Sequence, residues 1–445
     1  MSKEVTNVPA RGKQERAQPH DGVGGERRER SWAMFASLRV GNFRLYAGGQ
    51  VVSLLGTWIQ RIAQDWLVLE ISGGSPVALG VAVALQFLPM PLLTLWAGVL
   101  ADRLDKRRLL MSLQYGIGGC ALVLGTLDLA ELVQLWQVYV LCFGLGCCGA
   151  LEMPVRQSFV MEMVGQEQVG NAVALNSMIV NSCRVVGPAI AGYLITLIGT
   201  GWLFLLNALS LVAVVATLAT MDKDGIRSDS DGSRKRGQLV EGIRYVRHRS
   251  ELMLVLLLVC CIGTFGTTFN TSLAVMAEKV FLLGSDGFGL LHTMLAIGTL
   301  SGAALAAWRS GRSGPRLRLL VGSALAFGLL EILAALAPDA GTFGAALIAV
   351  GAAQMTFILT ANNTIQLSVD SALRGRVMAL YMLLLLGGTP LGSTLAGWTA
   401  EHLDARSPLL IGGGLSVLAA VFCAAMLTMR SDSSTRTARH GEHSK

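Results

Sequence analysis

The stretch from residue 50 to residue 65 gathers polar side chains on one side of a predicted helix. At ~100° per residue, its strongly polar residues fall within an arc of about 140°, and the remainder is mainly Val, Ile, Leu, Ala and Trp. The residues in the arc are Gln50, Ser53, Thr57, Gln60, Arg61, Gln64 and Asp65. In a bilayer this arc must face a wet cavity or the bundle interior, because a charge exposed to lipid costs at least ~2.5 kcal/mol.

Two residues of this arc suggest proton chemistry. The carboxyl of Asp65 could bind and release a coupling proton, with Arg61 tuning its proton affinity. Because the two side chains are four residues apart on a helix, they could instead form a permanent structural ion pair. Arg61 could equally contact an anionic substrate. Gln60 and Gln64 are the neighbouring candidates for the cavity wall.

Glu152 and Arg156 repeat the four-residue spacing at the cytoplasmic end of the fourth predicted span. We expect them to gate the pathway or to brace a loop, and direct substrate contact is the alternative. Arg184 lies inside a further apolar segment and needs a carboxylate or backbone carbonyls as partners. A bond between helices that forms in only one conformational state is the role we favour for it.

In the second half of the chain, the intramembrane ionisable residue is His292. A protonatable histidine could join a proton relay, but a hydrogen-bonded packing histidine is the favoured interpretation. Asn270 and Gln354 are uncharged polar candidates for the cavity or its rim.

The apolar blocks of the chain predict the helices that position these residues. Of the 445 residues, 52% are hydrophobic and 15% are charged, and the mean hydropathy is +0.55. The blocks are about twenty residues long, enough for a helix to cross a ~30 Å hydrocarbon layer. Helices satisfy their own backbone groups in lipid, and short alternating strands do not dominate here. We therefore expect an all-α integral membrane protein of about twelve spans. These are near 46–69, 77–100, 109–127, 134–153, 173–196, 200–220, 253–276, 287–308, 317–337, 342–363, 376–400 and 407–429.

The distribution of the 36 Lys and Arg residues predicts the orientation. They gather in the two tails and in alternate loops, whereas the loops on the opposite side hold only Lys279 and Arg406. By the positive-inside rule, both termini are cytoplasmic, and we expect a multi-pass protein of the bacterial inner membrane. The basic excess therefore reflects topology and does not indicate nucleic-acid binding.

Five regions follow from this pattern. They are a disordered cytoplasmic N-terminal tail (1–43), an N-terminal six-helix bundle (44–221), a cytoplasmic linker (222–252), a C-terminal six-helix bundle (253–429) and a disordered cytoplasmic C-terminal tail (430–445). The stretch Gln238–Arg249 within the linker predicts a short amphipathic helix. A weak repeat relates the fifth span of each half, where Ala174, Leu175, Gly187, Ala191 and Gly192 recur as Ala379, Leu380, Gly392, Ala396 and Gly397.

No pattern in the chain indicates an enzyme or a primary pump. The eight cysteines lie in predicted spans without zinc or redox spacing. Neither an H-E-x-x-H motif nor a phosphate-binding G-x-x-x-x-G-K-[ST] loop is present. We expect no cofactor and no metal. The expected partners are the bilayer, a small-molecule substrate and a proton, and we expect a monomer.

The loop after the second span carries a charge motif that starts at Gly98 and continues with Asp102, Arg103 and Arg107. This loop resembles the hallmark G-x-x-x-D-R-x-G-R-[RK] loop of the major facilitator superfamily, with Asp105 in place of its second glycine. The resemblance implies that Asp102, Arg103 and Arg107 form a cytoplasmic charge relay that closes the inner side of the outward-facing state. The matching loop of the second half has lost its acid, which argues against a symmetric second relay.

The fifth span carries Gly187-Pro188 followed by Gly192, which is similar to the Gly-Pro-rich antiporter motif of drug-exporting facilitators. Proline can kink a helix and glycine allows tight packing, so a kinked packing helix is the alternative. The wider pattern, including Gly56-Thr57-Trp58-Ile59-Gln60 and Arg374-Gly375-Arg376-Val377, resembles the bacterial branch of the enterobactin exporter and the macrolide-efflux proteins. The resemblance implies proton-coupled export of a siderophore or drug-like natural product by alternating access. Import of a small metabolite on the same fold and a non-transporting sensor are the alternatives.

Overall fold

The computed structural model describes residues 37, 40–93, 100, 104–164, 169–221, 238–266, 268–309 and 317–442. The described helices are all longer than one turn, and no strand occurs among these residues. In chain order they are α2 (Gly41–Ile71), α3 (Pro76–Phe87), α5 (Lys106–Leu129), α6 (Leu135–Val164), α7 (Val169–Thr220), α8 (Gln238–Arg247), α9 (Ser250–Cys261), η2 (Ile262–Gly266), α10 (Phe269–Val275), η3 (Met276–Val280), α11 (Ser285–Arg309), α12 (Leu317–Ala335), α13 (Ala340–Ser368), α14 (Ser371–Gly387), α15 (Thr389–His402) and α16 (Ser407–Glu442).

The lengths of these helices suit a membrane protein. Ten stretches are long and apolar enough to cross a bilayer. One of them, Gly170–Thr220, has 51 residues and turns at Gly199. Gly199 has a φ of +81°, which glycine adopts without steric cost. This stretch therefore provides two crossings. α2 is not among the ten because its polar stripe dilutes its apolar residues, yet its 31 residues reach about 46 Å. With α2 and the double crossing of α7 included, the described chain has the twelve crossings that the sequence predicts.

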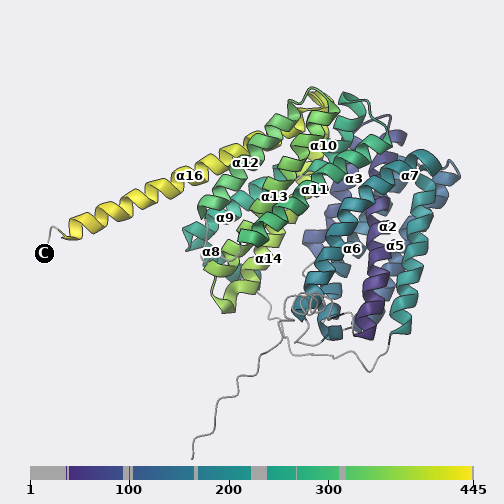
Figure 1. The fold of residues 1–445 in the computed structure, drawn as a ribbon, viewed down its shortest axis with the longest axis horizontal. Coiled ribbons are helices and arrows are strands. Elements are labelled where there is room, and N and C mark those ends of the chain that lie inside the picture. The colour runs from purple at the N-terminus through teal and green to yellow at the C-terminus, as the bar shows by residue number, and fades with distance from the viewer. Residues whose placement is uncertain are drawn as a thin grey trace, which may run out of the picture.

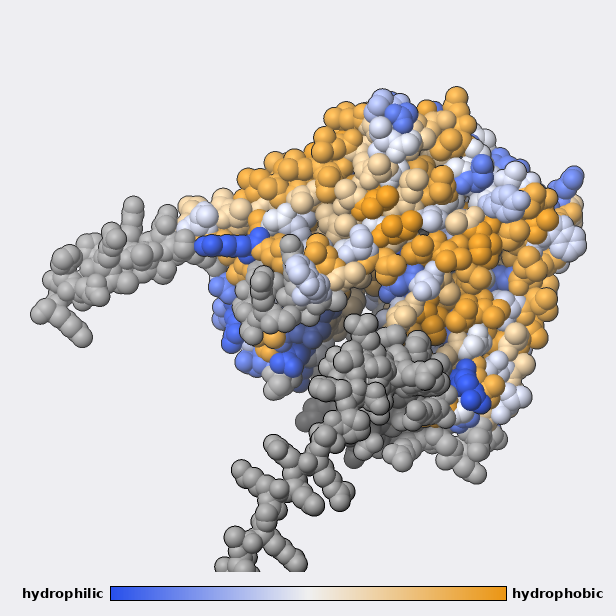
Figure 2. All heavy atoms as spheres, viewed as in Figure 1, coloured by the Kyte–Doolittle hydropathy of each residue, from blue (hydrophilic) through white to orange (hydrophobic). Residues whose placement is uncertain are grey.

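The helices pack in two groups. α2, α3, α5, α6 and α7 contact one another and form the first group, and α9 to α16 form the second. Figure 1 shows the two groups side by side, with the purple and teal helices of the first beside the green helices of the second. Large apolar side chains such as Trp202, Leu209 and Leu418 are exposed on their outer faces, and Figure 2 shows orange apolar residues covering much of the visible side. Such a surface suits contact with lipid tails rather than water.

The two groups meet along two glycine-containing helix pairs. α7 crosses α11, where a Cβ on Gly192 would lie 2.5 Å from the Ser285 carbonyl oxygen and one on Gly289 would lie 2.4 Å from that of Pro188. α3 crosses α15 in the same manner at Gly80 and Gly397. Because these positions lack side chains, the helix backbones approach to contact distance.

Hydrogen bonds join the two groups near these crossings. The Ser75 hydroxyl and the Val77 amide both donate to Oε2 of Glu401, at 2.6 and 3.0 Å. The hydroxyls of Thr196 and Ser285 lie 3.0 Å apart. All of these residues lie at the end of the molecule that carries the Gly199 turn and the loop before α11, so this end is closed by contacts between the groups.

Three elements differ from the sequence-based expectations. α16 continues to Glu442, so residues 430–442 are helical rather than disordered and project from the body (Figure 1). No proline interrupts this stretch, and the preceding turns nucleate it. The seventh span is not continuous, since π-helical turns flank α10. The eleventh span is divided between α14 and α15 at Gly388. The predicted amphipathic helix is present as α8. Most of the N-terminal tail and most of the linker lie outside the described residues, and the last tail residues, 41–43, are helical because α2 begins at Gly41.

The glycine crossing of α7 and α11 predicts a stability effect. Gly289→Leu should lower the free energy of unfolding by about 1–3 kcal/mol, because the side chain would meet the backbone of α7. The apparent midpoint of thermal unfolding in detergent measures this. Gly119→Leu is the matched control, since nothing lies within 4 Å of a Cβ at Gly119. Equal midpoints for the two variants would contradict the close crossing.

Candidate functional site

A cavity of about 240 Å³ lies within the first helix group. Its walls come from α2, α3, α5, α6 and α7, and they combine amides and charged groups with apolar side chains. From α2, the lining residues are Ser53, Leu54, Thr57, Gln60, Arg61 and Gln64. The polar stripe of α2 thus turns toward protein and cavity, where its groups need not contact lipid.

Asp65 lies one turn beyond Arg61 on α2 and is not part of this cavity wall. Its side chain is buried, with 1% of the residue exposed. Oδ2 has no hydrogen-bond partner among the described residues. A carboxyl in this position is expensive to ionise without a compensating group, so it is chemically suited to carry a proton in a closed state.

Side-chain amides connect α2 to its neighbours across the cavity. Asn207 of α7 donates from Nδ2 to Oε1 of Gln60. Gln64 donates from Nε2 to Oε1 of Gln86 on α3, at 3.4 Å. Gln86 and Asn207, together with Gln114 of α5, were not predicted from the sequence as site residues. The available signal was an amide inside an apolar span, which was considered for residues 50–65 and for the second half of the chain but not for the other spans of the first half.

Arg61 and Arg184 both pack on Trp58. Their guanidinium carbons lie 5.6 and 5.8 Å from its ring centroid, and Arg61 also lies 4.9 Å from the ring of Phe87. Cation–π contacts of this kind stabilise a desolvated guanidinium. Gly187 makes room for this arrangement, since a Cβ there would lie 2.5 Å from Cβ of Trp58.

The ion pair between Arg61 and Asp65 that the spacing allows is absent from the described part of the chain, where no carboxylate lies within 4.0 Å of Arg61. The guanidinium turns to the two aromatic faces instead. Arg184 likewise meets an aromatic ring rather than the expected carboxylate or carbonyl. The permanent-pair interpretation is therefore wrong for this conformation.

Glu152 and Arg156 form the pair that their spacing predicts. Nη1 of Arg156 lies 3.4 Å from Oε1 of Glu152, and Nε2 of Gln114 donates to the same oxygen at 3.0 Å. All three residues line the cavity. The pair lies on α6, and the Gln114 hydrogen bond joins it to α5 at the cavity wall. Its role as a gate, a loop brace or a substrate contact stays a prediction.

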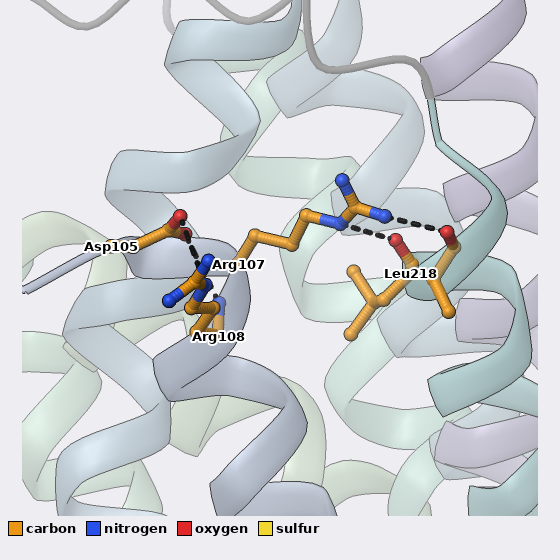
Figure 3. A network of polar contacts seen from close by, with 5 residues as sticks. Asp105, Arg107, Arg108 and Leu218 are labelled. Carbon is orange, nitrogen blue, oxygen red and sulfur yellow. Dashed lines mark hydrogen bonds and ion pairs between the residues drawn. The ribbon is translucent and has the colours of Figure 1, made fainter.

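The predicted charge relay falls largely outside the described residues, which do not include Gly98, Asp102 and Arg103. Arg107 is described, and Figure 3 shows it reaching across to α7. Its Nε donates to the carbonyl of Leu218 and its Nη2 to that of Ala219, both at 2.6 Å. A cation at the last carbonyls of a helix satisfies unpaired acceptors and complements the helix dipole.

Asp105 occupies the position of the second glycine in the resembled motif and caps α5. Its Oδ1 accepts a hydrogen bond from the Arg108 amide at 3.1 Å, a typical N-cap interaction. The Arg108 side chain lies 3.8 Å from the same carboxylate and is largely exposed. Arg107 and Arg108 therefore differ, since one is buried against α7 and the other faces outward.

In the second group, His292 packs in an aromatic column between the groups. Its ring lies edge-on to Phe288 at 4.8 Å, and Phe288 stacks on Trp66 of α2 at 5.9 Å. His292 is buried, and its Nε2 finds no acceptor or donor among the described residues. His292 is therefore a packing histidine, as expected, but the expected hydrogen bond is not made by Nε2 within the described chain.

The two amide candidates of the second group are placed only in part. Gln354 is buried on α13 and does not line the cavity. Asn270 belongs to α10, and its side chain lies outside the description. Gln354 therefore does not join the α2 stripe around the cavity in this conformation.

His292 is not the only intramembrane ionisable residue of the second half, contrary to the prediction. Glu331 lies within α12, inside the expected ninth span, and is 2% exposed. The signal was a single acid in a run of Leu, Ile and Ala. Across the described residues, no cluster of three His, Cys, Asp or Glu side chains could hold a metal.

The sequence profile of one protein family, described as transmembrane secretion effector, matches residues 32–443. A staphyloferrin A transporter from Staphylococcus aureus is 30% identical over 247 residues, which cover 55% of this chain and 61% of that protein. The chain thus spans less than two-thirds of that relative. Macrolide efflux protein A from Streptococcus pyogenes is 22% identical over 382 residues, covering 84% of this chain and 93% of the relative.

Solved structures of transporters share the fold. A bacterial homologue of the human lysosomal transporter Spinster, in an inward-facing and occupied conformation, superposes with a TM-score of 0.69 at 15% identity, covering 88% of this chain and 97% of the other. A D-xylose–proton symporter gives 0.67 at 16% identity, covering 86% and 96%. At this identity the likeness concerns the fold alone.

The hydrogen bonds of Arg107 predict that its replacement destabilises the protein much more than replacement of its neighbour Arg108. Arg107→Ala should lower the free energy of unfolding by about 1.5–3 kcal/mol, the range for hydrogen bonds to charged groups, because two buried carbonyls lose their donor. Arg108→Ala is the matched control and should change it by less than about 0.5 kcal/mol. Thermal unfolding in detergent measures both variants. Similar losses in the two would show that the Leu218 and Ala219 contacts contribute little.

Proposed function

The chain belongs to the transmembrane secretion effector family, in the bacterial efflux branch of the major facilitator superfamily, and on this basis we propose that it exports a small molecule in exchange for protons. The members of this family are transporters and not enzymes. The observation that carries the proposal is the polar stripe of α2, which lines a cavity and ends at the buried carboxyl of Asp65.

The proposed coupling places the proton and the substrate on the same helix. Asp65 takes up the proton, and Gln60, Arg61 and Gln64 contact the substrate in the cavity. Because these groups are within two turns of α2, a change of charge at Asp65 alters the field in the cavity directly. The cavity also presents Phe87 and other apolar side chains, which favours an amphiphilic natural product such as a siderophore or a macrolide-like drug.

The proposed transport cycle is alternating access between two six-helix bundles, residues 44–221 and 253–429. The contacts around Ser75 and Glu401 close one end, and we assign that end to the periplasm because the basic loops are opposite to it. Both termini are then cytoplasmic and the chain lies in the inner membrane as a monomer. The loop of Gly98, Asp102, Arg103 and Arg107 and the pair of Glu152 and Arg156 would guard the cytoplasmic side.

The helix-packing motif has a part in the same cycle. Gly187 receives Trp58 of α2, and Pro188 and Gly192 lie against Gly289 of α11. The motif therefore touches a helix of its own group and one of the other group within two turns. We propose that it transmits movement between the groups while α2 and its cavity change shape.

Everted membrane vesicles test this proposal. With an acidic lumen, addition of a transported compound should discharge the pH gradient, because an exporter carries protons out of the lumen as it moves substrate inward. Erythromycin and staphyloferrin A serve as probes, and a pH-sensitive dye reports the gradient. Asp65→Asn should abolish the discharge, whereas Glu70→Gln should leave it intact, since Glu70 is an exposed carboxylate on the same helix.

The outcomes separate coupling from direction. Discharge that persists in Asp65→Asn would exclude Asp65 as the coupling carboxyl. Proton-coupled uptake in right-side-out vesicles, with no discharge in everted ones, would make the chain an importer.

A further inference from the structure

Glu331 is a buried acid that the proposed transport mechanism does not use. It lies on α12 and is 2% exposed. Its Oε2 has no hydrogen-bond partner in the described part of the molecule, and no Lys, Arg or His side chain there lies within 4.0 Å of it. The residue belongs to the second helix group and is separate from the cavity around α2.

The surroundings of Glu331 are built from glycines and from the π-helical turn η2. A Cβ added to Gly412 of α16 would lie 3.1 Å from Oε1 of Glu331 and 2.5 Å from the carbonyl oxygen of Phe265 in η2. The carboxyl therefore occupies space that a side chain at Gly412 would fill. π-Helical turns often mark functional sites, because the wider turn disturbs the regular hydrogen-bond ladder.

A second polar group without a partner lies one turn away. A Cβ on Gly266 would lie 2.9 Å from Oγ of Ser416 and 2.5 Å from the ring of Phe327. Ser416 is fully buried and its Oγ has no hydrogen-bond partner within the described chain. Because Phe327 and Glu331 are four residues apart on α12, as are Gly412 and Ser416 on α16, these groups form two adjacent layers against η2.

The helices around Glu331 supply no charge to balance a carboxylate. No Asp, Glu, Lys, Arg or His occurs in η2, in α13 or in α16 up to Met429. At the end of α12, one turn beyond Glu331, Nη1 of Arg406 donates at 3.1 Å to the carbonyl of Ala335. An unpaired carboxylate buried in such a place is strongly destabilising, and neutralisation by a proton removes most of that cost.

We propose that Glu331 is a second proton-binding site, distinct from Asp65, in the second helix group. The carboxylic acid is neutral in this conformation. Its proton leaves when η2 separates from α12 and α16 and water reaches the carboxyl. A sodium site fits less well, because one carboxylate, one hydroxyl and one carbonyl do not complete the six or more oxygen ligands that hard cations prefer, as in calcium and magnesium sites.

Infrared difference spectroscopy of the purified protein at neutral pH tests this inference. Glu331→Gln should remove one carboxylic-acid C=O band, which appears as a positive band in the spectrum of wild type minus this variant. Glu331→Asp should shift that band without removing it, which keeps the test valid if the amide variant folds poorly. Asp404→Asn is the matched control, since this exposed acid should remove only a carboxylate band.

The response of the acid band to deuterium oxide and to sodium chloride gives two further tests. The acid band should shift slowly in deuterium oxide, because no water reaches the carboxyl in this state. Loss of a carboxylate band in Glu331→Gln would overturn the inference, as would conversion of the acid band to a carboxylate band when sodium chloride replaces choline chloride. The bands of Asp65 are assigned from Asp65→Asn, so failure at Glu331 is distinguishable from failure of the proposed export mechanism.

Discussion

A helix that crosses hydrocarbon with an arginine and an aspartate must turn both toward protein or water, and this constraint on α2 organises the first helix group. The stripe is met by amides from α3 and α7, by aromatic faces and by a cavity. Within the described part of the chain, no close ion pair neutralises its charges. The guanidinium of Arg61 rests on Trp58 and Phe87, while Asp65 is buried one turn away. Charges held in this manner stay available to a ligand or a proton.

Much of this arrangement was predictable from periodicity. Because the polar residues of α2 share one arc, the side of the helix that faces protein follows from the 3.6-residue repeat. The number of crossings follows from the apolar blocks, and the spacing of Glu152 and Arg156 predicts their contact. Each of these features is local along the chain, so its geometry is contained in a short segment of sequence.

The remaining features depend on segments that are distant in sequence. Arg107 belongs to a motif that suggests a carboxylate partner, yet its described partners are the carbonyls of Leu218 and Ala219 at the end of α7. The acceptors are backbone atoms, which leave no signal in residue types. Glu331 was overlooked because one acid in a leucine-rich run does not disturb the hydropathy of a span. The π-helical turn η2 beside it carries no residue pattern that distinguishes it from the apolar α-helix around it.

The glycine crossings near Ser285 and Glu401 have a mechanical consequence. Helices of about thirty residues extend roughly 45 Å from such a crossing. If the two groups rotate as rigid bodies about these crossings, a rotation of ~10° displaces the far ends of their helices by roughly 8 Å over that length. Contacts between glycine backbones can act as a hinge, because few interdigitated side chains must separate when the two groups rotate. A small angular change at one end is thereby amplified into an opening at the other that is wide enough for a drug-sized molecule.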